Sequence, residues 1–275
     1  MARRVTPEAK PLLKWAGGKA QLLPALAPFV RERSGRYIEP MIGGGALFFA
    51  LAPERALIAD INPELIGFYR AIVESLDKVL AQYAAWSFDE NTFYALRALR
   101  FEELDHVTAA ARLLYLNRAC YNGLYRVNRQ GLFNVPWGRY KRRFNPDPQQ
   151  FEAARAVLAR ARIELGDFRD VLEAEARTGD FVFLDPPYIP ISAYSDFKRY
   201  TRSQFHEPDH RAMAALVRRL ADRGCELVIT NSNHPLVHDL YQGYQIEIVP
   251  TRRNVNSRAQ GRTGEDVIIH VPATR

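Results

Sequence analysis

Short apolar segments alternate with amphipathic segments along most of the chain. The apolar segments have the length of strands and lie at 37–38, 56–59, 163–165, 181–184, 226–230, 245–249 and 267–271. Between them, residues 63–74 have the spacing of a helix, with Asn62 as its N-cap and Pro63 at its first position. Strands that alternate with helices predict a mainly parallel α/β sheet.

One long block interrupts this alternation. Residues 77–120 are a run of helical patterns rich in Ala and Leu, and residues 121–135 contain breaks at Gly123 and Gly131 that predict a loop or hairpin. A further helix is expected at 147–161. We therefore expect an inserted helical and hairpin domain at 75–147, carried by a catalytic domain made of 1–74 and 148–275.

The distribution of charge points to a polyanionic partner. Among 275 residues, Lys and Arg number 38 and Asp and Glu 31, a formal net charge of +7. From His106 to Pro146 there is no acidic residue, whereas aromatic residues are interleaved with Arg112, Arg118, Arg126, Arg129, Arg139, Lys141, Arg142 and Arg143. A second acid-free patch at 251–264 carries Arg252, Arg253, Arg258 and Arg262. Such patches predict a surface that faces phosphates.

Several other classes of protein are disfavoured. The chain has no apolar run of roughly 18 residues, so no membrane span is expected, and its charged N-terminus does not read as a secretion signal. Cys120 and Cys225 are too few for a disulfide framework or a four-cysteine zinc site, and the histidines lack metal-binding spacing. We expect a cytoplasmic, nucleoid-associated monomer that holds no metal.

A glycine-rich turn follows the first strand candidate. In Glu39-Pro-Met-Ile-Gly-Gly-Gly-Ala46 the glycines let the backbone approach a ligand, and the following helix start adds positive potential. Asp60 ends the next strand candidate, where a carboxylate can accept both hydroxyls of a ribose. The spacing fits neither the dinucleotide fingerprint nor a P-loop, which favours a nucleoside ligand without a pyrophosphate.

A second turn presents only hydrogen-bond acceptors. The apolar segment 181–184 runs into Asp185-Pro-Pro-Tyr188, in which two prolines fix φ and remove two backbone N–H donors. The Asp185 carboxylate and the Pro186 carbonyl remain, next to the ring of Tyr188. An exocyclic amine donates two hydrogen bonds and lies against an aromatic face, so this array suits such an amine.

At these residues a family resemblance becomes evident. The segments Lys14-Trp-Ala-Gly-Gly-Lys19, Glu39-Pro-x-x-Gly-Gly-Gly45, Gly166-Asp-Phe168 and Asp185-Pro-Pro-Tyr188, in this order, resemble the Dam-type DNA adenine-N6 methyltransferases. The block 117–126, followed by 131–139, resembles the target-recognition hairpin of that family, and 189–205 and 262–270 resemble its C-terminal part. The resemblance spans nearly the whole chain. It implies a Rossmann-like S-adenosylmethionine-dependent sheet that acts on duplex DNA, with GATC as the suggested site.

The resemblance also implies roles for individual residues. The catalytic turn is Asp185, Pro186, Pro187 and Tyr188. The cofactor would be bound by Trp15, Lys19, Glu39, Gly43, Gly45, Asp60, Asp167, Phe168 and Asp185. Positions that contact DNA in the family are occupied by Lys14, Arg118, Tyr121, Asn122, Leu124, Arg126, Asn128 and Pro136. One departure is Met41, where the family usually has Phe.

Alternative functions remain open. Methylation at cytosine C5 needs a thiolate nucleophile, typically after a proline, and neither cysteine has that context. Methylation at cytosine N4 presents the same amine geometry and is the nearest rival, although the hairpin favours adenine. A catalytically inactive DNA-binding protein with a methyltransferase core is a further alternative. A nucleotide-dependent oxidoreductase would leave both the acid-free block and the acceptor turn unexplained.

Overall fold

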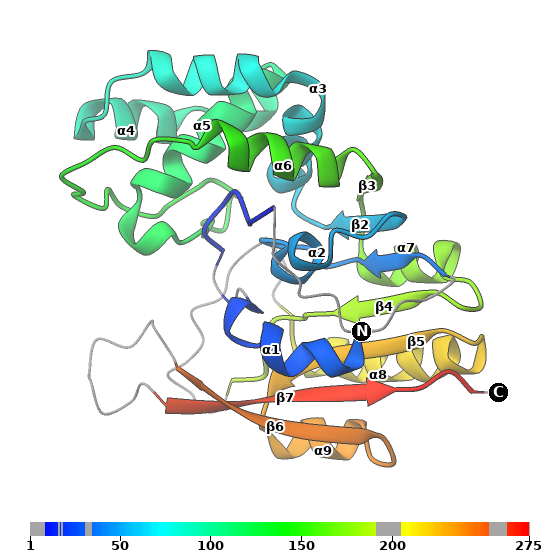
Figure 1. Cartoon of the computed structure of the whole chain (residues 1–275). Helices are drawn as coiled ribbons and strands as arrows, with labels where there is room; N and C mark the ends of the chain where they lie inside the picture. The colour runs from blue at the N-terminus through cyan, green and yellow to red at the C-terminus, as the bar shows by residue number, and fades with distance from the viewer. Residues whose placement is uncertain are drawn as a thin grey trace.

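The computed structural model describes residues 9–15, 17, 19–30, 35–190, 205–252 and 263–274. Its centre is a seven-stranded sheet in the order β3-β2-β1-β4-β5-β7-β6 (Figure 1). The strands are β1 (Tyr37–Glu39), β2 (Ala56–Asp60), β3 (Ala161–Leu165), β4 (Phe181–Leu184), β5 (Glu226–Ser232), β6 (Gln245–Arg252) and β7 (Thr263–Val271). Strands β1 to β5 pair in parallel, and β7 pairs antiparallel with both β5 and β6. The predicted α/β sheet is confirmed.

Successive residues of each central strand face opposite sides of the sheet. Ile38 and Val182 point into one core with α7 (Phe168–Glu175), α8 (Glu207–Asp222) and α9 (Pro235–Leu240). Tyr37 and Phe181 point into the other core with α1 (Leu23–Leu26), α2 (Ala46–Leu51), α3 (Pro63–Ala85) and α6 (Pro148–Leu158). Because both faces are covered, the central strands are apolar throughout, which is the pattern of a parallel sheet.

Two helix boundaries differ from the expectation. The helix predicted at 63–74 continues as α3 to Ala85, past a non-helical Ser75 with φ −148°. The helix predicted at 147–161 ends at Leu158, because the chain turns there and Ala161 already pairs in β3. Short 3-10 helices lie at Lys19–Gln21, Ala27–Phe29, Phe101–Glu103 and Tyr121–Gly123. None of the helices in the described ranges is long and apolar enough to span a membrane.

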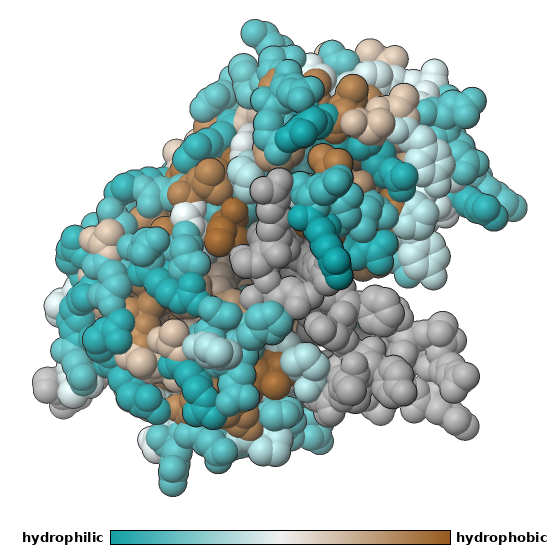
Figure 2. Space-filling view, turned by 180° about the vertical axis from the view of Figure 1, so that it is seen from behind, coloured by the Kyte–Doolittle hydropathy of each residue, from teal (hydrophilic) through white to brown (hydrophobic). Residues whose placement is uncertain are grey.

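A helical block lies beside the sheet and packs on α3. It contains α4 (Glu90–Ala98) and α5 (His106–Ala119), followed by a loop with two isolated bridges, Cys120 to Trp137 and Val127 to Phe133. Figure 2 shows the molecule from behind, with this block above the part that is built on the sheet. The buried side chains of α5 belong to the same core as one face of the sheet. The domain boundaries at 75 and 147 stay a prediction, and the first falls inside α3.

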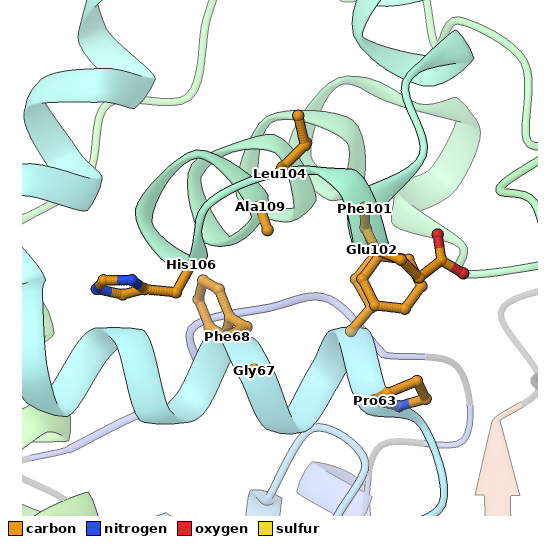
Figure 3. Close-up of a pocket in the computed structure, with 9 residues that line it drawn as sticks. Pro63, Gly67, Phe68, Phe101, Glu102, Leu104, His106 and Ala109 are labelled. Atoms are coloured by element: carbon orange, nitrogen blue, oxygen red, sulfur yellow. The ribbon is translucent and has the colours of Figure 1, made fainter.

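A cavity of about 210 Å³ lies between α3 and the segment that leads into α5. Figure 3 shows Gly67 and Phe68 of α3 on one wall and Phe101 and Leu104 on the other. A Cβ atom built on Gly67 would meet no atom within 4 Å. Since glycine inside a helix costs about 0.5–1 kcal/mol relative to alanine, this position leaves stability unused.

We expect Gly67→Ala to raise the free energy of unfolding by about 0.5–1 kcal/mol. Urea titration followed by circular dichroism measures the change. Gly243→Ala is the matched control, since its Cβ also meets nothing within 4 Å but its φ is +92°. The control should lose about 1 kcal/mol, because a left-handed backbone strains alanine. A destabilised Gly67→Ala protein would show that the cavity cannot take a methyl group.

Candidate functional site

The predicted site residues gather at the carboxyl edge of the sheet. The strand order reverses between β1 and β4, so the connections that leave these two strands separate and open a crevice at their ends. Glu39 ends β1, Asp60 ends β2 and Asp185 follows β4. The sheet topology therefore brings together three carboxylates that are far apart in the sequence.

Glu39 is a buried carboxylate beneath the crevice. Its side chain is 2% exposed, and its Oε2 accepts a 2.7 Å hydrogen bond from the Tyr37 hydroxyl. Burial raises the pKa of Glu39 well above its usual range, and the nearby charges of Asp185 and Asp60 raise it further. The Glu39 carboxyl therefore stays protonated to a higher pH than an exposed glutamate, next to the positions where a ligand would lie.

The glycine-rich turn connects β1 to α2 and leans on Asp60. The Gly43 N–H donates to Asp60 Oδ2 at 3.0 Å, and the Tyr69 hydroxyl donates to the Gly43 carbonyl at 2.7 Å. Gly43 and Gly45 have φ of +46° and +67°. A Cβ on Gly43 or Gly44 would lie 2.9 Å from the Trp15 side chain, so only glycine allows this close approach.

Trp15 closes the turn on its outer side. Its indole stacks on the Tyr125 ring with centroids 5.0 Å apart and an interplanar angle of 20°. Tyr125 belongs to the loop after α5, so Trp15 lies between the glycine turn and the helical block. The predicted neighbour of the cofactor is thereby held from both sides.

Asp60 offers a carboxylate to the crevice. Its Oδ1 accepts from the Asn62 N–H at 2.9 Å, and burial raises its pKa to about 6. Two apolar side chains adjoin Asp60. Ile61, the next residue, is 46% exposed, and Leu165 of β3, which pairs with Asp60 in the sheet, is 51% exposed. Sequence reasoning missed both residues. An apolar side chain directly after a strand-ending acid is the signal that points to Ile61.

Asp167 and Phe168 lie at the start of α7. Asp167 caps the helix by accepting from the Arg169 N–H at 2.9 Å, and the Arg169 guanidinium lies 3.1 Å from its other oxygen. Phe168 is buried, with its ring centroid 5.9 Å from that of Phe205. Both residues border the Asp60 end of the sheet, since Gly166 donates to the Asp60 carbonyl. Their predicted contact with the cofactor's adenine stays a prediction.

The acceptor turn after β4 is held by the neighbouring strand. Asp185 Oδ1 accepts from the Thr230 hydroxyl at 2.7 Å. The Ile189 N–H donates to Asn231 Oδ1 at 3.1 Å, and the Ser232 hydroxyl donates to the Ile189 carbonyl at 2.7 Å. These three polar residues at the end of β5 were also missed by sequence reasoning. Their signal is a polar triplet that directly follows a buried apolar strand.

Lys19 supplies the positive charge of the turn. Its Nζ lies 2.7 Å from Asp185 Oδ1 and 4.3 Å from the centroid of the Tyr188 ring, although the side chain is buried. Burial and the Asp185 charge raise the pKa of Tyr188 well above its usual value. The ammonium therefore contacts both the carboxylate and the aromatic ring that the sequence predicts for an amine, and that role stays a prediction.

The residues expected to contact DNA lie on the helical block. Asn117 holds the Lys14 backbone, accepting from its N–H at 2.8 Å and donating to its carbonyl at 2.7 Å. Tyr121 is 55% exposed, and Asn122 is exposed with φ +55°. Leu124 is partly buried and packs against the core. Lys14 links this group to the cofactor side, because Trp15 is the next residue.

Residues 126–136 form the predicted hairpin. Arg126 Nε donates to Asn134 Oδ1 at 2.8 Å, which fixes one edge of the guanidinium. Asn128 uses its own carbonyl oxygen to accept from the N–H groups of Gln130 and Leu132, at 2.9 and 3.0 Å. Pro136 is exposed, and its carbonyl accepts from the Tyr121 N–H. The loop is thus closed by its own hydrogen bonds.

Some arginines of the acid-free stretch do not face phosphates, which corrects the sequence interpretation. Arg112 is 2% exposed, 2.5 Å from Glu64, and donates to the Leu96 and Leu99 carbonyls. Arg143 donates to the Trp86 carbonyl at 2.9 Å and covers the Tyr83 ring. Arg118 lies with its guanidinium 4.0 Å from the centroid of the Phe144 ring and donates to the Leu12 carbonyl, and its expected contact with DNA stays a prediction. Arg253, Arg258 and Arg262 of the second patch lie outside the described residues.

Neither cysteine has the environment of a nucleophile. Burial raises the pKa of Cys120 to about 12 and that of Cys225 to about 11, so both are protonated thiols near neutral pH. Within the described part of the chain, no three His, Cys, Asp or Glu side chains form a group that could hold a metal ion. Covalent chemistry through a thiolate therefore has no support from the site.

A parallel sheet with one antiparallel strand, β7, between β5 and β6 is consistent with a Rossmann-like methyltransferase fold. The chain belongs to the family of D12 class N6 adenine-specific DNA methyltransferases, which matches residues 15–255. The resemblance to adenine-N6 enzymes is confirmed.

Known relatives cover almost the whole chain. It is 37% identical over 269 residues to the type II methyltransferase M1.LlaDCHI of Lactococcus lactis subsp. cremoris, with 94% of both chains covered. It is 34% identical over 277 residues to the type II methyltransferase M.MjaIII of Methanocaldococcus jannaschii, with 93% of this chain and 96% of the relative covered. The DNA adenine methylase of Vibrio cholerae serotype O1 is 31% identical over 262 residues, with 94% of both chains covered.

If Asp60 binds the ribose hydroxyls, as the sequence predicts, its raised pKa makes cofactor binding depend on pH. A hydroxyl donates more strongly to an ionised carboxylate, and protonation of Asp60 sets in as pH falls through about 6. We expect the affinity for S-adenosylmethionine to fall about tenfold from about pH 7.5 to about pH 5. Isothermal titration calorimetry measures it, with Asp60→Asn as the control that subtracts the ligand's own titration. Equal pH dependence in both proteins would contradict the role of Asp60.

Proposed function

We propose that this chain transfers a methyl group from S-adenosylmethionine to N6 of an adenine that is flipped out of duplex DNA. The proposed recognition sequence is GATC. The carrying observation is the acceptor turn of Asp185, which is held by Thr230 at the switch point of the sheet. The family supports adenine as the base. The relatives named DNA adenine methylase support the Dam-type reading of the hairpin.

The crevice fits the expected cofactor. Gly43 and Gly44 let Trp15 pack closely against the turn, Asp60 offers an acceptor for ribose hydroxyls, and Ile61 and Leu165 expose apolar surface for a base. Glu39 lies beneath and keeps water from the β1 end. When bound, S-adenosylmethionine supplies an electrophilic methyl group. The chain's own task is to hold an amine in line with it, because positioning provides much of the acceleration.

Asp185 orients the amine. Its carboxylate and the Pro186 carbonyl accept the two N–H bonds, which draws the nitrogen towards a tetrahedral shape and frees its lone pair. Lys19 lies 2.7 Å from Asp185 Oδ1, the same oxygen that accepts from Thr230, so Oδ2 is the oxygen that can accept from the amine. Thr230 keeps the carboxylate in place. No covalent intermediate with the protein is needed.

The adenine has to leave the base stack, because its N6 is paired and stacked inside the duplex. Flipping costs a few kcal/mol, and stacking on Tyr188 with hydrogen bonds to the turn offsets it. The Tyr188 face that Lys19 covers at 4.3 Å is the face that the base would take. The Lys19 ammonium, which contacts the Tyr188 ring in this structure, then attracts the negatively charged nucleotide instead.

Recognition is proposed to lie on the helical block. Tyr121 and Asn122 are exposed at the end of α5, and Arg126 follows on the hairpin. The relatives include type II methyltransferases, which supports a place in restriction–modification. We propose a monomer that acts in the cytoplasm on nucleoid DNA, since one chain carries both the acceptor turn and the hairpin.

Replacing Asp185 tests the polarisation of the amine. We expect Asp185→Ala to lower the methylation rate at least about a hundredfold, because one preorganised group is lost. Transfer of tritium from labelled S-adenosylmethionine to unmethylated duplex measures the rate. Asp170→Ala, an exposed carboxylate of α7, is the control. An unchanged circular-dichroism spectrum and melting temperature show that the variant is folded, and substantial turnover by a folded Asp185→Ala protein would refute the role.

Replacing Arg126 tests base reading. Nε and one N–H of Nη2 are held by Asn134, and the remaining Nη N–H groups can donate to guanine O6 and N7. Arg126→Ala should therefore lose about 1–3 kcal/mol of discrimination at one base pair. Methylation of duplexes with single substitutions in GATC measures this loss. Arg129→Ala, exposed on the same hairpin, should weaken all sequences equally. An equal loss on every duplex for Arg126→Ala would make it a phosphate contact.

A further inference from the structure

A second cavity lies at the amino edge of the sheet, at the opposite end of the strands from the acceptor turn. Its volume is about 500 Å³. In Figure 1 the arrowheads of β2 and β4 point away from this edge. Its lining contains a single carboxylate, Asp180, and the five arginines Arg36, Arg55, Arg160, Arg162 and Arg177. The residues of the proposed methyltransferase site do not line it.

The register of the sheet places three of these arginines in a row. Tyr37 pairs with Ala56, and Ala56 pairs with Ala161, so the residues just before them, Arg36, Arg55 and Arg160, follow one another across β1, β2 and β3. Neighbouring strands lie about 4.8 Å apart, and the row spans about 10 Å. Like charges in direct lateral contact destabilise a sheet. Packing of the fold therefore does not explain why all three positions are cationic.

The described carboxylates compensate this charge only in part. Arg36 contacts Asp180 at 3.3 Å and Glu175 at 3.4 Å, and Arg162 contacts Glu175 at 3.1 Å as well as Glu164. The Arg177 guanidinium donates hydrogen bonds to the Ala174 and Ala176 carbonyls. Arg160 is exposed and has no carboxylate partner in the described ranges. Arg36 and Arg162 thus share three carboxylates, whereas Arg160 contacts none in the described part of the chain.

We propose that this cluster, Arg36, Arg55, Arg160, Arg162 and Arg177, binds the phosphate backbone of a second DNA segment. A guanidinium matches a phosphate with two parallel hydrogen bonds. A row of about 10 Å corresponds to about three nucleotides of one strand at 3.4 Å each. The cations are mostly exposed and spread over four strand ends, which suits an extended polyanion better than one small enclosed anion.

The segment is distinct from the duplex whose base reaches Asp185. The cluster and the acceptor turn lie at opposite ends of parallel strands, so one straight duplex cannot contact both. Binding here reads no bases, and it keeps the protein on DNA while the catalytic edge exchanges one target for another. This inference goes beyond the proposed methyl transfer and does not depend on it.

The test measures a second duplex on a preformed complex. The protein is saturated with an unlabelled GATC duplex and sinefungin, a stable cofactor analogue, and a labelled duplex without GATC is then added while its anisotropy is followed from about 50 to about 200 mM salt. We expect Arg55→Gln/Arg160→Gln to weaken the second binding about tenfold and to reduce the salt slope by about two. Lys78→Gln/Arg211→Gln, on exposed helix positions, removes the same charge elsewhere and should match the wild type.

Two further arms keep the result unambiguous. Arg160→Glu should weaken the second duplex more than Arg160→Gln, in proteins with unchanged melting temperature. Inorganic phosphate is titrated at constant ionic strength as the small-anion probe. The proposal is overturned if the wild type binds no second duplex or if the cluster variants bind it like the control. It is also overturned if inorganic phosphate saturates the cluster and thereby prevents the second duplex from binding. Methylation of the first duplex, measured separately, reports on the proposed activity.

Discussion

Parallel pairing of β1 with β2 and β4 places three carboxylates on one edge of the sheet, and the surrounding side chains and backbone groups stabilise their charge. Glu39 accepts a hydrogen bond from a tyrosine hydroxyl, and Asp60 accepts from two backbone N–H groups. Asp185 forms an ion pair with Lys19 and accepts a hydrogen bond from Thr230. Each carboxylate is thereby oriented as well as stabilised. Oriented acceptors in a crevice are what a site needs to hold both a nucleoside ligand and an amine.

A buried ion pair fixes the helical block to this edge. Glu64 lies in the first turn of α3, four residues after Asp60, and its carboxylate meets Arg112 of α5 and the Tyr125 hydroxyl. Removing one partner of such a pair would cost about 3–5 kcal/mol, since the other charge would stay buried. Tyr125 also stacks on Trp15, which touches the glycine turn. The hairpin and the crevice therefore share one rigid frame.

The sequence predicted the surroundings of charged side chains less well than any other property. The acid-free stretch 106–146 indicates a polyanionic partner, yet Arg112 balances Glu64 from another helix and Arg143 binds the carbonyls at the end of α3. Conversely, the arginines at 36, 55 and 160 are scattered singly in the sequence and become neighbours only through strand register. Direction and proximity of charged side chains follow from packing, which no local pattern records.

The sequence by itself determined the strands, the glycine turn and Asp185-Pro-Pro-Tyr188, because these depend on local apolar periods and on the backbone limits of glycine and proline. It also marked Asp60 by its place after a strand. Only the tertiary structure decided that Lys19 lies on Asp185, that Thr230, Asn231 and Ser232 brace the turn, and that Ile61 and Leu165 stay exposed. Those contacts join segments far apart in the chain, and the strand order of the sheet alone brings them within hydrogen-bonding distance.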